Sequence, residues 1–185
     1  MTELDRMMVI VDDITRLEVD AIVTFAGGGL DGESGLDGGI HAVAGEQLLE
    51  TCRLIGGCDP GEAVSTSGFE LPARTVIHTV GPIWNGGRDG ERELLRSCYQ
   101  RSLEIASDLE CNSLAFSCIS TGEDDYPRHD ACRIAIDTIT DFLSGHRHPK
   151  HVIICCSRQE DGEIYRREVR SARRGDTGIG SDHRR

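Results

Sequence analysis

Lysine is almost absent from this sequence. Lys150 is the only lysine in 185 residues, and arginine provides every other basic side chain. Because no lysine follows a glycine-rich loop, a Walker A phosphate site is excluded. Apolar runs of the roughly 20 residues that cross a bilayer are also missing, and residues 1–10 show no signal-peptide pattern. We therefore expect a cytoplasmic protein that does not engage membranes.

Acidic residues outnumber basic residues by 32 to 20, which gives a net charge of −12. A surface of this sign repels phosphate backbones, so the composition disfavours general nucleic-acid binding. An acidic, lysine-poor surface suits a high-salt cytoplasm. A high-GC genome would produce the same arginine bias, and both origins fit the sequence.

Cys-x-x-Cys pairs are absent, although the chain contains eight cysteines. Several cysteines lie within apolar runs, as Cys118 and Cys155 do, which favours buried free thiols over a disulfide framework. His146, His148 and His151 gather around a proline, a pattern typical of a solvated loop rather than a metal centre. The sequence therefore predicts no metal site and no cofactor.

Short apolar segments alternate with segments of helical periodicity. The strand patterns cover residues 8–11, 21–25, 64–69, 75–80, 113–119 and 152–156, and the helical patterns cover 41–55, 91–109, 127–145 and 161–171. This alternation predicts an α/β fold with a mostly parallel sheet that helices cover on both faces. We expect one domain over residues 1–172 and a disordered tail over 173–185.

Two loops follow strands at the sheet edge where such folds bind ligands, at residues 26–39 and 120–126. The first is rich in glycine, which lets backbone N–H groups converge on phosphate oxygens, although a flexible connector is the alternative. Its literal GxGxxG match is weak, because the loop continues past Gly32, and a Rossmann-type dehydrogenase is disfavoured. The second loop offers Ser120, Thr121 and Gly122 as donors. Together the two loops suggest a diphosphate site.

Asp13 follows the first predicted strand. Its carboxylate is placed either to accept a hydrogen bond from an adenine amino group or to cap a turn, and local sequence chemistry favours the cap.

Taken in order, these residues resemble the macrodomain family, specifically its MacroD-type branch that processes ADP-ribose. The matching stretches are Asp13-Ile14-Thr15, Val19-Asp20-Ala21-Ile22-Val23, Gly35-Leu36-Asp37-Gly38-Gly39-Ile40-His41, Ala44-Gly45, Gly61-Glu62-Ala63, Leu71-Pro72-Ala73, Val76-Ile77-His78-Thr79-Val80-Gly81-Pro82, Cys98-Tyr99, Ile119-Ser120-Thr121-Gly122 and Tyr126-Pro127. They extend over nearly the whole chain. The resemblance implies a three-layer α/β/α macrodomain with a mixed, mostly parallel sheet.

The resemblance also implies an ADP-ribose cleft and a metal-independent hydrolase of O-acetyl-ADP-ribose or of ADP-ribosyl esters on proteins. Asp13 and Ile14 would contact adenine, and Asp37 would be the catalytic carboxylate near the distal ribose. The ligand-binding set would further include Gly27, Gly35, Leu36, Ser120, Thr121, Gly122, Glu123 and Asp124, with His41 and Arg158 as supporting residues. The expected partners are these nucleotides and ADP-ribosylated proteins, and the expected state is a monomer.

Three segments depart from the family pattern. Gly27 replaces an asparagine that contacts the distal ribose, so we expect slow hydrolysis. Glu123, Asp124 and Asp125 replace an aromatic and a glycine, and their charges would repel a diphosphate. Arg158 lies where an aromatic packs on adenine in many members. The alternative function is a non-catalytic nucleotide-sensing or protein-interaction module that resembles ribonuclease regulators.

Overall fold

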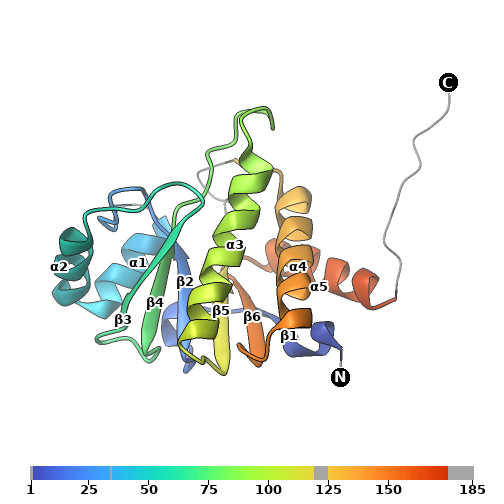
Figure 1. Cartoon of the computed structure of the whole chain (residues 1–185), viewed down its shortest axis with the longest axis horizontal. Helices are drawn as coiled ribbons and strands as arrows, with labels where there is room; N and C mark the ends of the chain where they lie inside the picture. The colour runs from blue at the N-terminus through green and yellow to red at the C-terminus, as the bar shows by residue number, and fades with distance from the viewer. Residues whose placement is uncertain (1, 34, 119–124, 175–185) are drawn as a thin grey trace.

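A computed structural model describes residues 2–33, 35–118 and 125–174 of the chain. Six strands form one sheet in the order β1-β6-β5-β2-β4-β3, and β3 alone runs antiparallel to its neighbour (Figure 1). The strands are β1 Met7–Val11, β2 Ala21–Phe25, β3 Ala63–Ser67, β4 Thr75–Thr79, β5 Ser113–Ser117 and β6 His151–Cys156. The helices are α1 Gly35–Ala44, α2 Glu46–Ile55, α3 Glu91–Asp108, α4 Arg128–Gly145 and α5 Gln159–Arg173, with 3₁₀ turns at Glu3–Arg6 and Ile14–Arg16. The predicted α/β class is confirmed.

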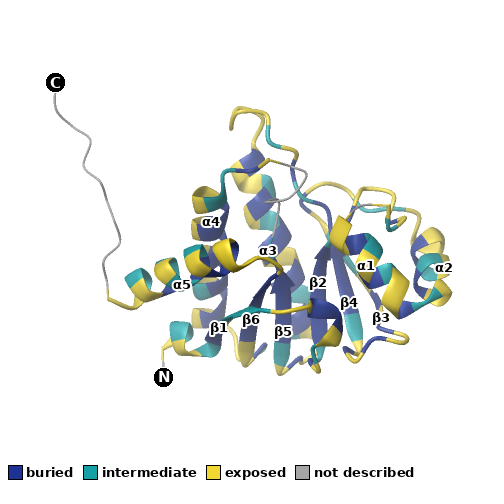
Figure 2. Ribbon diagram, turned by 180° about the vertical axis from the view of Figure 1, so that it is seen from behind, coloured by how far each residue is buried: buried dark blue, intermediate teal, exposed yellow. Residues whose placement is uncertain are grey.

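Helices cover both faces of the sheet, which explains why its central strands β2, β5 and β6 are largely buried (Figure 2). In β2, Ala21 and Val23 belong to the cluster that contains side chains of α3, α4 and α5. Ile22, between them, belongs to the cluster formed with α1 and α2. Successive side chains of a strand point to opposite faces, so this alternation produces the three layers that the family resemblance implies.

The single helix predicted over residues 41–55 is wrong, because the structure contains two helices there. Gly45 has a φ of 87°, a left-handed conformation that separates α1 from α2. Helix α1 also begins at Gly35, so residues 35–39 are helical instead of belonging to the glycine-rich loop. Burial of Ile40 and Ala44 holds this glycine-rich turn in a helix despite its low intrinsic propensity.

All eight cysteines are free thiols, and six of them are buried. The prediction of free thiols is therefore confirmed, whereas Cys118, expected to be buried, is partly exposed, as is Cys58. Helix α5 extends to Arg173, so the predicted tail begins inside a helix, and residues 175–185 lie outside the described part of the chain. Within that part, no helix combines the length and the apolar character needed to cross a bilayer.

Candidate active site

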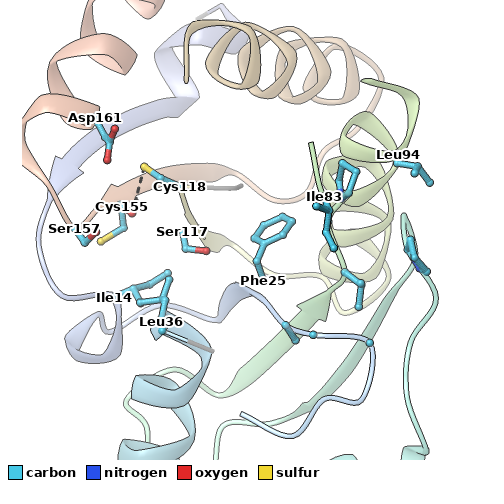
Figure 3. A pocket seen from close by; sticks show the side chains of 18 of the residues that line it. Ile14, Phe25, Leu36, Ile83, Leu94, Ser117, Cys118, Cys155, Ser157 and Asp161 are labelled. Atoms are coloured by element: carbon cyan, nitrogen blue, oxygen red, sulfur yellow. Dashed lines mark hydrogen bonds between the residues drawn. The ribbon is translucent and has the colours of Figure 1, made fainter. Parts of the chain in front are cut away.

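A cleft of about 1090 Å³ opens at the carboxyl ends of the parallel strands. Its walls come from the segments that follow β1, β2, β4, β5 and β6 and from the first turn of α1. Figure 3 shows Ile14 and Ser157 toward one end of the cleft, and Phe25 and Ile83 toward the other. The cleft therefore lies where doubly wound α/β folds bind their ligands.

Asp13 borders the cleft and caps the 3₁₀ turn that follows β1. Its Oδ1 accepts hydrogen bonds from the Thr15 hydroxyl at 2.7 Å and the Thr15 amide at 3.0 Å. These bonds, the hydroxyl first, lower the pKa of Asp13. The cap that local sequence chemistry favours is present. The second oxygen, Oδ2, is 3.6 Å from Arg16 Nε, and the side chain is 48% exposed, so the carboxylate also faces solvent.

Arg158 and Ile14 border the same region of the cleft. The Arg158 Nε lies 3.3 Å from the carboxylate of Asp161, a buried residue in the first turn of α5. Arg158 is the single lysine or arginine among the described residues that line the cleft. A ligand phosphate must therefore be bound mainly by dipolar donors.

The first turn of α1 provides such donors. Gly35 and Leu36 line the cleft, together with Gly27 and Gly28 from the loop after β2. Amide groups at a helix N-terminus have no partner within the helix and carry a partial positive charge, so they favour anions. Gly27 has no positive φ, and a Cβ added to it would meet no atom within 4 Å. This position therefore has room for a side chain.

Asp37 lies behind the wall of the cleft and is absent from the described residues that line it. Its carboxylate is 1% exposed. Oδ1 accepts a hydrogen bond of 3.0 Å from the Thr24 hydroxyl, and Oδ2 lies 3.7 Å from His41 Nε2. Burial raises the pKa of Asp37. The structure thus places Asp37 and His41 in contact with each other.

Other cleft residues were missed from the sequence, among them Phe25, Ile83, Ser117 and Cys118. Phe25, Ser117 and Cys118 lie at or just after the end of a strand, and this position is the signal that would have found them, whereas Ile83 lies further along the loop after β4. Cys118 Sγ lies 2.7 Å from Cys156 Sγ.

Glu91 organises the loop before α3, at the edge of the cleft. Its buried carboxylate accepts hydrogen bonds from the amides of Asn85, Gly87 and Asp89 at 2.7–3.0 Å.

Ser120, Thr121, Gly122, Glu123 and Asp124 fall outside the described residues. Their neighbour Cys118 lines the cleft, and Asp125 is exposed with a φ of 52°. Their predicted contacts with a diphosphate remain predictions.

Comparison with known proteins identifies relatives over most of the chain. The Macro domain family model matches residues 24–135. A Macro domain-containing protein of Mesorhizobium japonicum is 46% identical over 172 residues, which is 93% of this chain and 98% of the relative. An O-acetyl-ADP-ribose deacetylase of Cronobacter turicensis is 44% identical over 166 residues, 88% of this chain and 94% of the relative.

Solved structures with the same fold include ligand complexes. The Oceanobacillus iheyensis macrodomain with ADP has a TM-score of 0.86 and 38% identity, with 90% of this chain and 91% of that chain covered. A Trypanosoma brucei macrodomain in complex with ADP-ribose has a TM-score of 0.83 and 36% identity, with 89% of this chain and 69% of that chain covered.

Proposed function

The chain belongs to the macrodomain family, and from this membership we propose that its cleft binds ADP-ribose and hydrolyses O-acetyl-ADP-ribose or ADP-ribosyl esters on proteins. The observation that carries the proposal is the N-terminus of α1 at the wall of a cleft of about 1090 Å³. A dinucleotide-like ligand needs such a volume, and its diphosphate needs such donors.

The ends of the cleft suggest how the ligand lies. Asp13 and Ile14 are proposed to contact adenine, and Arg158 lies beside them at the same rim. The amides at Gly35 and Leu36 would then bind the diphosphate, and Ser120, Thr121 and Gly122 of the second loop are proposed to contribute to the same contact. The distal ribose would reach Gly27 and the end that Phe25 and Ile83 form. Glu123 and Asp124 would border the same ligand from the second loop.

Hydrolysis needs a base that orients a water molecule toward the ester carbonyl or the anomeric carbon. We assign this role to Asp37. Its raised pKa makes it a stronger base than an ordinary carboxylate. Thr24 donates a hydrogen bond to Oδ1, and Oδ2 lies 3.7 Å from His41 Nε2 without a hydrogen bond to any described residue. Because Asp37 lies behind the cleft wall, a water molecule must reach it past Gly35 and Leu36. Gly27 offers no side chain to fix the distal ribose, so turnover is expected to be slow.

The test is single-turnover hydrolysis of O-acetyl-ADP-ribose by Asp37→Asn. The variant keeps the volume of the buried side chain but loses the base, so the hydrolysis rate should fall at least 100-fold, within the roughly 10²–10⁴-fold range of general-base catalysis. ADP-ribose affinity should change little. Asp31→Asn is the matched control, because Asp31 lies in the loop just before α1 and is exposed. Unchanged hydrolysis by a folded Asp37→Asn protein would rule out this mechanism.

A non-catalytic ADP-ribose sensor or interaction module is the second candidate. The burial of Asp37 and the missing side chain at Gly27 favour it, because both weaken the catalytic arrangement. Tight ADP-ribose binding without turnover in the wild-type protein would establish this function. In either case we propose a cytoplasmic monomer whose substrates include ADP-ribosylated proteins, and the free thiols of all eight cysteines fit a reducing compartment.

A further inference from the structure

Two cysteine sulfurs are in contact at the wall of the cleft. Cys118 directly follows β5, and Cys156 is the last residue of β6. Their Sγ atoms lie 2.7 Å apart, and the Cys118 thiol donates a hydrogen bond to the Cys156 sulfur. Both side chains are free thiols, so the contact is not a covalent bond. Neither thiol takes part in the proposed hydrolysis.

The sheet brings the two side chains together. Strands β5 and β6 are parallel neighbours, and Ser117 pairs with Cys155 in their register. The next residue of each chain segment is a cysteine, so Cys118 and Cys156 lie side by side. Neighbouring strands are about 4.7–4.9 Å apart, which is within the roughly 4.4–6.8 Å that a disulfide spans between Cα atoms. The strand pairing therefore positions the two thiols for cross-linking.

We propose that Cys118 and Cys156 form a thiol pair that hydroperoxides oxidise to a disulfide. The two sulfur atoms need to approach by about 0.7 Å to reach the disulfide bond length of about 2.04 Å. Small rotations about the two Cα–Cβ bonds are sufficient for such a shift. This modification does not depend on which ligand the cleft binds.

The two cysteines differ in their access to solvent. Cys118 is partly exposed and lines the cleft (Figure 3), whereas Cys156 is completely buried. A small hydroperoxide that enters the cleft therefore meets Cys118 first. Cys156 belongs to the core cluster that includes side chains of α3, α4 and α5. We therefore assign the first oxidation to Cys118 and the formation of the disulfide to attack by Cys156.

The reaction has two steps. The Cys118 thiolate attacks one oxygen of the hydroperoxide and the O–O bond breaks, which leaves a sulfenic acid on Cys118 and an alkoxide that takes up the proton lost by Cys118. The Cys156 sulfur then attacks the Cys118 sulfur, the S–O bond breaks, and hydroxide leaves as water with the Cys156 proton. The two thiols give up two electrons and two protons, and the peroxide takes them up as one alcohol and one water. Exchange with two molecules of a small thiol reduces the disulfide again.

The environment of the pair makes this oxidation slow. The contact with Cys156 and, after it, burial raise the pKa of Cys118. Because the thiolate is the nucleophile, a raised pKa lowers the reactive fraction at neutral pH. The thiols should therefore survive brief exposure to peroxide, and the disulfide should accumulate during prolonged exposure. In a reducing compartment, transient disulfides of this kind are typical of redox sensing.

The test exposes the fully reduced full chain to hydrogen peroxide until Cys58 is oxidised. The remaining thiols are then blocked under denaturing conditions, and the intact protein and its peptides are measured by mass spectrometry. We expect loss of two hydrogen atoms and a cross-linked peptide pair that contains Cys118 and Cys156. Dithiothreitol should restore both thiols. In Cys156→Ser the disulfide should be absent, and dimedone, which traps sulfenic acids, should label Cys118.

Two cysteine variants serve as matched controls. Cys58 is the other partly exposed thiol, and Cys132 is buried in the same core cluster as Cys156. Cys58→Ser and Cys132→Ser should both form the disulfide as the wild type does. If Cys156→Ser fails to fold by circular dichroism, Cys118→Ser provides the same test from the partly exposed member of the pair.

Oxidation of Cys58 in a wild-type protein whose Cys118 and Cys156 remain thiols would overturn the proposal. A disulfide that persists in Cys118→Ser, or that joins other cysteines, would overturn it as well. ADP-ribose binding is measured separately on the reduced protein, so failure of the thiol pair and failure of the proposed function are distinguishable.

Discussion

The Asp13 carboxylate caps the 3₁₀ turn after β1 and also borders the cleft. Removing it in Asp13→Ala should cost about 1 kcal/mol of folding stability through the lost cap on Thr15. If the same carboxylate accepts a hydrogen bond from adenine, the variant should also lose roughly 1–3 kcal/mol of ADP-ribose affinity. Chemical denaturation and calorimetry measure these two quantities on one protein.

Asp13→Ser separates the two roles, because serine caps a turn but is shorter and neutral. It should restore most of the stability and none of the affinity. Unchanged ADP-ribose affinity in Asp13→Ala would show that Asp13 caps the turn but does not bind adenine.

Gly27 offers a gain-of-function prediction. The Cβ of an asparagine at this position would meet no atom within 4 Å, and the backbone has no positive φ. If its amide fixes the distal ribose, Gly27→Asn should increase the hydrolysis rate, by about tenfold for each ~1.4 kcal/mol by which the barrier falls. Single-turnover kinetics on O-acetyl-ADP-ribose measure this change.

Gly39→Asn is a matched control, since Gly39 also has open space but does not line the cleft. It should leave turnover unchanged. A folded Gly27→Asn protein that binds ADP-ribose and is no faster than wild type would contradict the idea of a weakened hydrolase.

At the residue scale, the sequence was a better guide to which residues belong near the site than to the contacts that their side chains make. It singled out Asp13 by its place after a predicted strand, and Asp37 and His41 through the family resemblance; of these, Asp13 lines the cleft. It could not show that Asp37 contacts Thr24, because the two residues meet only after β2 and α1 pack together. Burial and pairing of a carboxylate depend on neighbours that are distant along the chain.

At the scale of elements, the region after β2 shows why boundaries are difficult to predict. Its glycines favour a loop by propensity, yet Gly35 begins α1, whose Ile40 packs completely in the core. The break between α1 and α2 occurs at Gly45, whose φ of 87° is a value that favours glycine. A periodic apolar pattern continues through such a break, so periodicity predicted one helix where packing produces two.

The loop that Glu91 organises leads to a prediction about pH. Backbone hydrogen bonds, first to its own amide and then to those of Asn85, Asp89 and Gly87, lower the pKa of Glu91 to about 2. A lowered carboxyl pKa stabilises the fold above the unfolded value near 4.5, and this contribution disappears as the pH falls toward 2. The melting temperature of Glu91→Gln should therefore be a few degrees below that of the wild type at pH 7. This difference in melting temperature should become smaller as the pH falls from 5 to 3.

Glu93→Gln is the control, because Glu93 lies in the same first turn of α3 and is exposed. Its melting temperature should follow that of the wild type throughout. A difference between Glu91→Gln and wild type that does not vary with pH would show that the carboxylate charge has no part in holding the loop.

At the scale of the whole molecule, alternation of apolar strands and amphipathic helices was sufficient to predict the layers. The order of the strands was not predictable, because β1 pairs with β6 across almost the whole sequence and local patterns carry no signal for such pairs. The cleft follows from that order. It brings the ends of β1, β2, β4, β5 and β6 to one edge, and the sequence indicated site residues after four of these strands but none after β4.

The molecule is acidic, yet the proposed ligand is an anion. With a net charge of −12 and Arg158 as the single lysine or arginine among the described residues of the cleft wall, affinity must come from backbone dipoles and apolar contacts. Long-range repulsion between like charges is screened by salt. ADP-ribose affinity should therefore hold or increase as ionic strength rises, which is the reverse of the behaviour of a basic phosphate site.

Titration calorimetry of the full chain with ADP-ribose, AMP and NAD tests the central claim most directly. We predict one ADP-ribose per chain, bound more tightly than AMP, because the cleft extends from the Asp13 end past α1 to Phe25 and Ile83. AMP occupies only part of that length. Equal affinity for AMP and ADP-ribose, or no heat with any of the three ligands, would contradict the assignment of this cleft to ADP-ribose.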